Sequence, residues 1–347
     1  MNNTQDMRGE AYRLLARLWL AEVDAPLAET LRGLPGFAEH IPARADAAWR
    51  DEMAAEYQRV LAENIYPYES VFLGDDLMLN TEVTRRVESF YRDAGFAPGA
   101  ARVAALDHLG VELECMARLI AAEVAGPDPD AARQRQARWL AEHLARWAPV
   151  CALTVARLAP HPIYRALAQL TWELVLAEAS RSDPLSPWER DGVRVLNPGA
   201  DSETLTQPLP EGEGPDEPSS PPLALWARGP GGEGESLGQV ARTLLTPARV
   251  GVFLGREDLR RIGRALGLPT PLGDRFAMLR ALFEAAAQFD LLPDLPEALA
   301  ALWRDADAQI AALMADAPSW ADYGVEWRQR LAAGQALLDD VREGLEG

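Results

Sequence analysis

Apolar side chains recur along most of this chain at the spacing of an α-helix. In residues 109–120, for example, Leu109, Leu113, Met116 and Ile120 follow one another at intervals of four, three and four residues. This spacing places the four side chains on one face of a helix, and such a face is usually buried. No stretch shows the sustained two-residue alternation that is typical of a half-buried strand. The pattern therefore predicts an all-α protein.

Proline and glycine divide the chain into three parts. The first part, residues 1–180, is predicted to be a helical bundle, and its longest helical stretch, residues 131–159, is expected to hold two helices that meet at Pro149. Residues 181–238 are rich in proline, glycine, serine and acidic residues, so they cannot bury enough apolar surface to offset their ordering entropy. We expect them to form a disordered linker. The helices expected in the first part span residues 9–21, 27–31, 43–61, 78–94, 104–125, 131–159 and 163–179.

Helical patterning resumes in the third part, residues 239–347. Proline and glycine mark the ends of its helices, and Trp303, Trp320 and Trp327 are expected to anchor its core. This region carries no motif that points to chemistry. It is either a second lobe packed on the first or an accessory helical module. The expected helices span residues 256–266, 274–289, 295–315 and 320–345.

The composition excludes several classes of function. The net charge of −19 argues against binding to nucleic acid or anionic lipid and favours a basic partner. All 34 lysine-or-arginine positions hold arginine. The absence of lysine excludes a Walker-A phosphate loop and Schiff-base chemistry, which both require a lysine. The two cysteines are too few for a disulfide framework or a cysteine-built metal site. Charged residues stud residues 1–30, so we expect neither a secretory signal nor membrane insertion, and a cytoplasmic location.

An aromatic and acidic stretch lies at residues 66–76. Tyr68 and Phe72 stand beside Glu69 and Asp75 in this stretch. Carboxylates can bind the guanidinium groups of an arginine pair, and aromatic side chains can bind an apolar segment. The residues therefore favour a peptide-binding surface. The alternative is that the aromatic residues join two helices in the core while the acids are only solvated.

A second polar stretch begins at Asp107, just before the apolar stripe of residues 109–120. Asp107 is expected to be the N-cap of the helix that carries this stripe, because its carboxylate can accept from first-turn amides. His108, Glu112 and Cys115 then lie on one strip of the helix. A metal site at His108 and Glu112 has no second His-Glu pair to complete it, and an acidic neighbour raises the pKa of a thiol. We therefore predict a hydrogen-bonded histidine, a buried thiol, no metal or cofactor, and no enzyme activity.

Both stretches resemble motifs of the TorD/DmsD/NarJ family of cytoplasmic chaperones for molybdoenzyme maturation. Tyr68-Glu69-Ser70-Val71-Phe72 is similar to the family's aromatic-x-x-hydrophobic-Phe motif. Asp107-His108 and the following helix are similar to its Glu/Pro-Asp-His motif, although Ala104-Ala105-Leu106 precedes Asp107 here. The resemblance spans residues 9–178. It implies a TorD-like helical bundle that binds the twin-arginine signal peptide, the apo form, or both, of a molybdenum-cofactor oxidoreductase and assists cofactor insertion before export.

The resemblance also implies a set of peptide-binding residues and a mode of association. Family members form dimers by exchanging helices, and the loop at residues 95–107 is where exchange would occur here. We expect a monomer with a minor domain-swapped dimer. A rival hypothesis is a non-catalytic helical adaptor that holds two protein partners through its two lobes. The residues expected to contact the peptide are Tyr68, Glu69, Phe72, Asp75, Asp107, His108 and Glu112.

Overall fold

The structure is a computed structural model that describes residues 2–75, 78–99, 103–181 and 237–346. All regular elements in these ranges are helices, which confirms the predicted all-α class. The predicted linker falls almost wholly on residues 182–236, which lie outside the described residues. None of the helices in the described ranges is long and apolar enough to cross a membrane.

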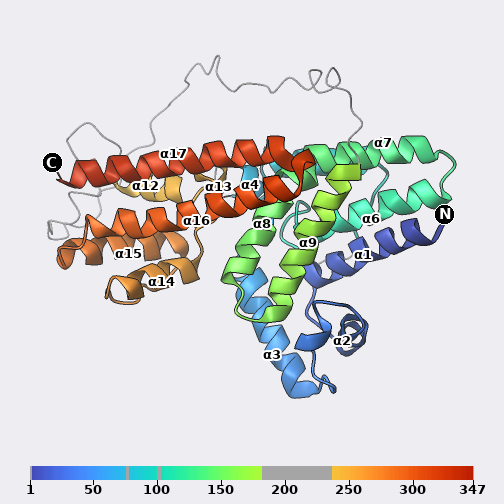
Figure 1. Ribbon diagram of the computed structural model, residues 1–347, viewed down its shortest axis with the longest axis horizontal. Coiled ribbons are helices and arrows are strands. Elements are labelled where there is room, and N and C mark those ends of the chain that lie inside the picture. Colours follow the sequence, from blue (N-terminus) through green and yellow to red (C-terminus); the bar gives the residue numbers. More distant parts are fainter. Residues whose placement is uncertain (1, 76–77, 100–102, 182–236, 347) are drawn as a thin grey trace, which may run out of the picture.

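The N-terminal lobe comprises residues 2–181. Its centre is α6, which is buried on nearly every side, and α1 packs along it while α8 packs along α9 (Figure 1). The stripe of Leu109, Leu113, Met116 and Ile120 is at most 1% exposed, as its spacing predicted. The elements of this lobe are α1 (Asn2–Leu20), α2 (Ala25–Arg32), η1 (Ala38–His40), α3 (Ala47–Tyr57), η2 (Gln58–Ala62), α4 (Glu69–Leu73), α5 (Glu82–Asp93), α6 (Leu109–Ala125), α7 (Pro129–Trp139), η3 (Leu140–Leu144), α8 (Ala145–Leu158) and α9 (Pro162–Arg181).

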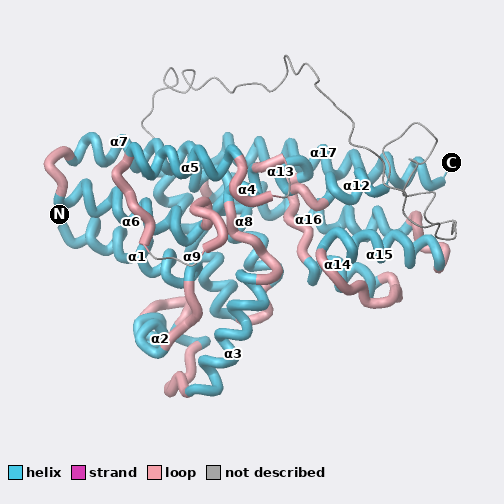
Figure 2. The backbone as a smooth tube through the Cα atoms, turned by 180° about the vertical axis from the view of Figure 1, so that it is seen from behind, coloured by secondary structure: helices cyan, strands magenta, loops and turns pink. Residues whose placement is uncertain are grey.

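The C-terminal lobe comprises residues 237–346. Its long helices α16 and α17 lie side by side and reach towards α8 and α9, as both views show (Figures 1 and 2). Buried apolar side chains of the two lobes form one continuous cluster, so this region is a second lobe packed on the first. The domain boundaries near residues 180 and 239 stay predictions. The elements are α12 (Leu237–Leu244), α13 (Pro247–Val250), α14 (Arg256–Ala265), α15 (Arg275–Gln288), α16 (Asp294–Asp316), η4 (Pro318–Trp320) and α17 (Ala321–Glu346).

Pro149 does not separate two helices, so that prediction was wrong. Pro149 lies inside α8, and the helical geometry changes earlier, in the π-helical turn η3. Because proline has no N–H, the Ala145 carbonyl one turn earlier lacks its usual partner within the helix. Trp320 of the C-terminal lobe supplies that partner: its Nε1 donates to Ala145 O at 2.7 Å. Docking of the second lobe thus satisfies the carbonyl that the proline leaves free.

The three tryptophans predicted to anchor the core of the C-terminal lobe do so. Trp303, Trp320 and Trp327 are each at most 1% exposed. Trp303 donates to Val250 O at 2.8 Å within its own lobe. Trp327 joins Trp320 at the other lobe, since its Nε1 donates to Arg146 O at 2.6 Å. Two of the three anchors therefore bind the first turn of α8.

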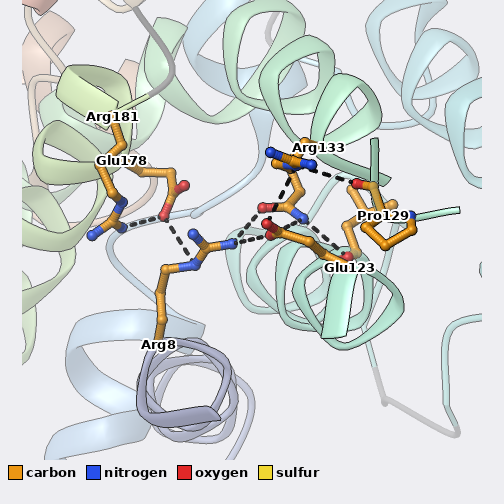
Figure 3. A network of polar contacts seen from close by, with 8 residues as sticks. Arg8, Glu123, Pro129, Arg133, Glu178 and Arg181 are labelled. Atoms are coloured by element: carbon orange, nitrogen blue, oxygen red, sulfur yellow. Dashed lines mark hydrogen bonds and ion pairs between the residues drawn. The ribbon is translucent and has the colours of Figure 1, made fainter. Parts of the chain in front are cut away.

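A polar network ties four helices of the N-terminal lobe together (Figure 3). Arg8 of α1 donates to Glu123 of α6 at 3.0 Å and to Gln136 of α7 at 2.5 Å. Its Nε also lies 3.7 Å from Glu178 of α9, which accepts a bond from Arg181. Because Glu123 and Glu178 are nearly buried, each needs such a cationic partner. The network therefore joins the N-terminal end of α1 to α6, α7 and α9.

The loop predicted to permit helix exchange begins with an anchored turn. Gly95 adopts a φ of +65°, a conformation that favours glycine. Phe96 follows, only 8% exposed, with its ring edge-on to Tyr91 at 4.9 Å. Residues 100–102 lie outside the described residues. Exchange of helices across this loop, and the minor dimer, stay predictions.

Candidate functional site

The two motif stretches lie side by side in the structure. The Glu69 N–H donates to Asp107 O and the Leu109 N–H donates to Pro67 O, each at 2.9 Å. These bonds form an isolated antiparallel bridge between Tyr68 and His108, whose rings meet edge-on at 5.0 Å. The bridge holds the N-terminus of α4 against that of α6. We refer to the buried residues Tyr68, Glu69, Phe72, Asp107, His108 and Glu112 as the motif cluster.

Asp107 caps a different helix from the one predicted. Its Oδ2 accepts from the Ser70 N–H at 2.8 Å, in the first turn of α4, and its Oδ1 accepts from Thr84 Oγ1 of α5 at 3.1 Å. The predicted helix over residues 104–125 begins only at Leu109, and His108 is its N-cap. The reason is the bridge with Tyr68, which keeps the backbone before Leu109 extended and turns the Asp107 carboxylate towards α4.

His108 is a neutral, hydrogen-bonded residue. Burial lowers the pKa of His108 to about 3, so its ring carries no charge near neutral pH. Its Nδ1 accepts from the Gly110 N–H at 3.1 Å, which satisfies a first-turn amide of α6. The prediction of a hydrogen-bonded histidine is confirmed.

Two buried glutamates occupy the interior of the motif cluster. Glu69 Oε2 lies 2.9 Å from His143 Nδ1, and Glu112 Oε2 accepts from Trp147 Nε1 at 3.1 Å. Both carboxylates are at most 1% exposed. Burial, then the charges of Glu69 and Asp107, raise the pKa of Glu112 well above its usual value. No donor within the described residues bonds to Glu112 Oε1, and a hydrogen bond with the Glu69 carboxylate also raises the pKa of Glu112, so the neutral acid is the favoured form.

The aromatic residues of the cluster meet the C-terminal lobe. Phe72 is fully buried, with Trp147 at 5.6 Å and Phe253 stacked on it at 5.6 Å and an interplanar angle of 18°. Tyr68 accepts from the Ala104 N–H at 3.2 Å. Both are core residues, as the alternative reading of this stretch expected, but Glu69 beside them is buried rather than solvated.

Asp75 lies apart from the other predicted peptide-binding residues. It is exposed and follows the end of α4, and its charge acts on Arg330 of α17, whose guanidinium stacks on Trp327 at 4.5 Å. The other six predicted residues are buried in the motif cluster. Peptide contact by these seven residues stays a prediction.

Neither a metal site nor a reactive thiol is assembled in the described ranges. Those ranges contain no group of three or more His, Cys, Asp or Glu side chains that could hold a metal ion. Cys115 is fully buried, as predicted, and burial followed by the charges of Glu112 and Glu114 raises the pKa of its thiol. A raised pKa leaves the thiol protonated and unreactive.

Several residues that complete the cluster could not be selected from the sequence. Thr84, His143 and Trp147 each bond to a motif carboxylate, and Phe253 stacks on Phe72 from the other lobe. They lie far from the motifs along the chain, and their own stretches read as ordinary helix or loop. Of these residues only His143 could have been considered from the sequence, because it is one of only four histidines. Nothing in the sequence indicated that it contacts Glu69.

The fold and the site define an all-helical protein in which two separate motifs are interlocked by buried hydrogen bonds. The family model described as nitrate reductase delta subunit matches residues 20–152, which contain both motifs. The match confirms, over residues 20–152, the resemblance to the TorD/DmsD/NarJ family of molybdoenzyme maturation chaperones. Members of the family are chaperones and not catalysts, in agreement with the predicted lack of enzyme activity. No curated protein matched the chain.

Replacing Glu112 with glutamine is expected to stabilise the protein, increasingly so as pH rises. The folded-state pKa of Glu112 is raised well above its usual value, so the folded state binds its proton more tightly than the unfolded state does. Wild-type stability therefore decreases as pH rises from the unfolded pKa through the folded one. Glutamine stays neutral and keeps an oxygen for Trp147. Thermal unfolding near pH 5 and near pH 8 measures the difference.

The matched control for this experiment is Glu114→Gln on the same helix. Glu114 is partly exposed and lies on another face of α6. A stabilisation by Glu112→Gln that is the same at both pH values, or that Glu114→Gln reproduces, would contradict the assignment of a protonated Glu112.

Proposed function

We propose that this chain is a cytoplasmic chaperone that binds the twin-arginine signal peptide, the apo form, or both, of a molybdenum-cofactor oxidoreductase. It would assist insertion of the cofactor before export. The observation that carries the proposal is the pairing of the two family motifs: residues 67–69 and 107–109 are bonded side by side within the matched region. Such pairing brings the aromatic motif and the Asp-His motif to one place on the lobe.

The chemistry of this place suits a basic and apolar peptide. Asp75 is exposed at the end of α4, on a chain whose net charge is −19, and a carboxylate binds guanidinium groups in a bidentate manner. Tyr68 and Phe72 are buried at the start of α4, and they would receive the apolar part of the peptide once the contacts that cover them open. We therefore expect the arginine pair near Asp75 and the apolar segment along α4.

Isothermal titration with a synthetic leader peptide tests the proposal. The peptide carries an Arg-Arg pair followed by an alanine- and leucine-rich segment. We expect it to bind, and we expect Asp75→Asn to weaken binding by about 3- to 30-fold, the range typical of one partly exposed charged contact. Asp51→Asn on α3 is the matched control, because it removes an equally exposed carboxylate elsewhere.

The outcomes separate the proposal from its rival. Absence of binding, or binding that is unchanged when the peptide's Arg-Arg pair is replaced by Ala-Ala, would contradict signal-peptide recognition. Retention of the mature client without its leader in a pulldown, together with indifference to the peptide, would favour the helical adaptor. Equal effects of Asp75→Asn and Asp51→Asn would assign the affinity to net charge alone.

A further inference from the structure

The aromatic face of α4 is covered by a short segment of the C-terminal lobe. Residues 251–255, which we call the covering segment, connect α13 to α14 without helical structure. Their three central side chains, Val252, Phe253 and Leu254, are at most 4% exposed. α13 lies beside α4 in both views (Figures 1 and 2). An extended apolar stretch is thus inserted between two helical lobes.

The covering segment is held in the way that proteins hold peptides. Its side chain Phe253 stacks on Phe72, and its carbonyls accept bonds from arginines on either side. Arg157 of α8 donates to Phe253 O at 2.9 Å, and Arg275 of α15 donates to Leu254 O at 3.3 Å. Main-chain hydrogen bonds combined with side-chain insertion are the usual features of peptide recognition.

Glycines at both ends allow the segment to lie this close to its surroundings. A Cβ on Gly255 would meet Leu158 of the N-terminal lobe at 2.7 Å. Gly251 has a φ of +77°, and a Cβ there would meet Leu331 of α17 at 2.7 Å. A larger residue at Gly251 would be strained and would meet the Leu331 backbone, and one at Gly255 would require the Leu158 side chain to move.

We propose that the covering segment is an intrachain ligand that occupies the place on α4 where the apolar part of a client peptide binds. This inference rests on the proposed function. A client peptide and Phe253 cannot both contact Phe72, so the client binds only when the segment withdraws. The apparent affinity for the client is then reduced by the fraction of molecules in which α4 is uncovered.

Replacing Phe253 with alanine tests the proposal. The variant loses the stack on Phe72, so the uncovered form becomes more populated, and the leader peptide described above should bind at least about tenfold more tightly than to the wild type. Phe283→Ala is the matched control, because it removes an equally buried phenylalanine from α15 in the same lobe. A synthetic peptide with the sequence of residues 247–258 should compete with the leader for the Phe253→Ala protein.

The outcomes distinguish this inference from the proposed function. If the wild type, Phe253→Ala and Phe283→Ala bind the leader peptide equally well, the covering role is overturned. The proposed function still stands in that case, provided that Asp75→Asn weakens leader binding. Absence of leader binding to all three rejects both. If circular dichroism shows that Phe253→Ala does not fold, Phe253→Leu takes its place. It should also bind the leader peptide more tightly than the wild type, because leucine keeps apolar bulk and cannot stack on Phe72.

Discussion

Replacing Arg157 with methionine is expected to lower the free energy of unfolding by about 3–5 kcal/mol. Arg157 of α8 forms an ion pair with Asp258 of α14, and it also donates to the Phe253 carbonyl. The Asp258 side chain is 2% exposed, and removing the guanidinium leaves its charge only the Gly255 N–H at 2.9 Å and the more exposed Arg261 at 3.6 Å. Methionine retains the apolar stem and isolates the electrostatic loss. Urea unfolding monitored by tryptophan fluorescence measures the change.

A surface ion pair provides the control for this variant. Arg304 and Glu297 are bonded at 2.8 Å, but each side chain is 54% exposed. Arg304→Met should therefore cost only about 0–1 kcal/mol. A loss no larger for Arg157→Met than for Arg304→Met would show that the inter-lobe pair contributes little. The double variant Arg157→Met with Asp258→Asn should recover part of the loss, because the buried carboxylate charge that has lost its closest cation is then removed.

Replacing Asp107 with alanine is expected to destabilise the protein by about 2–4 kcal/mol, because two buried donors lose their acceptor. Those donors are the Ser70 N–H and the Thr84 hydroxyl, both bonded to the fully buried carboxylate. Asp107→Asn should be milder. Its oxygen can still accept from Ser70, while the Thr84 hydroxyl can rotate to accept from the new amide. Thermal unfolding of both variants measures the difference.

An exposed helix cap is the matched comparison for Asp107. Asp46 accepts from the Trp49 N–H at 3.0 Å at the start of α3, on the surface. Asp46→Ala should cost about 1 kcal/mol, as is usual for an N-cap. Hydrogen exchange at Ser70 should accelerate in Asp107→Ala and not in Asp46→Ala. Equal losses for the two alanine variants would refute a special role for the buried cap.

Most of the helices, and the faces that they bury, could be predicted from the sequence alone. The stripe on α6 and the tryptophan anchors follow from spacing and side-chain size, which depend on no distant partner. It also identified the two motif stretches, because their aromatic, acidic and Asp-His residues adjoin one another along the chain. Helix starts were predicted less well. The N-cap of α6 is His108 and not the predicted Asp107, because the bridge between Tyr68 and His108 keeps the backbone before Leu109 extended. No pattern in the local sequence predicts that bridge.

The contacts between residues far apart in the chain could not be predicted, because they depend on how the two lobes pack. Periodicity shows that a face is buried but does not show what covers it, so Phe253 could not be matched to Phe72 from their positions. Pro149 was read as a helix break because its missing N–H leaves a carbonyl free, yet Trp320 from the other lobe satisfies that carbonyl. Residues this far apart in the chain come into contact because their shapes and hydrogen-bonding groups are complementary once the lobes pack. Local sequence does not show that complementarity.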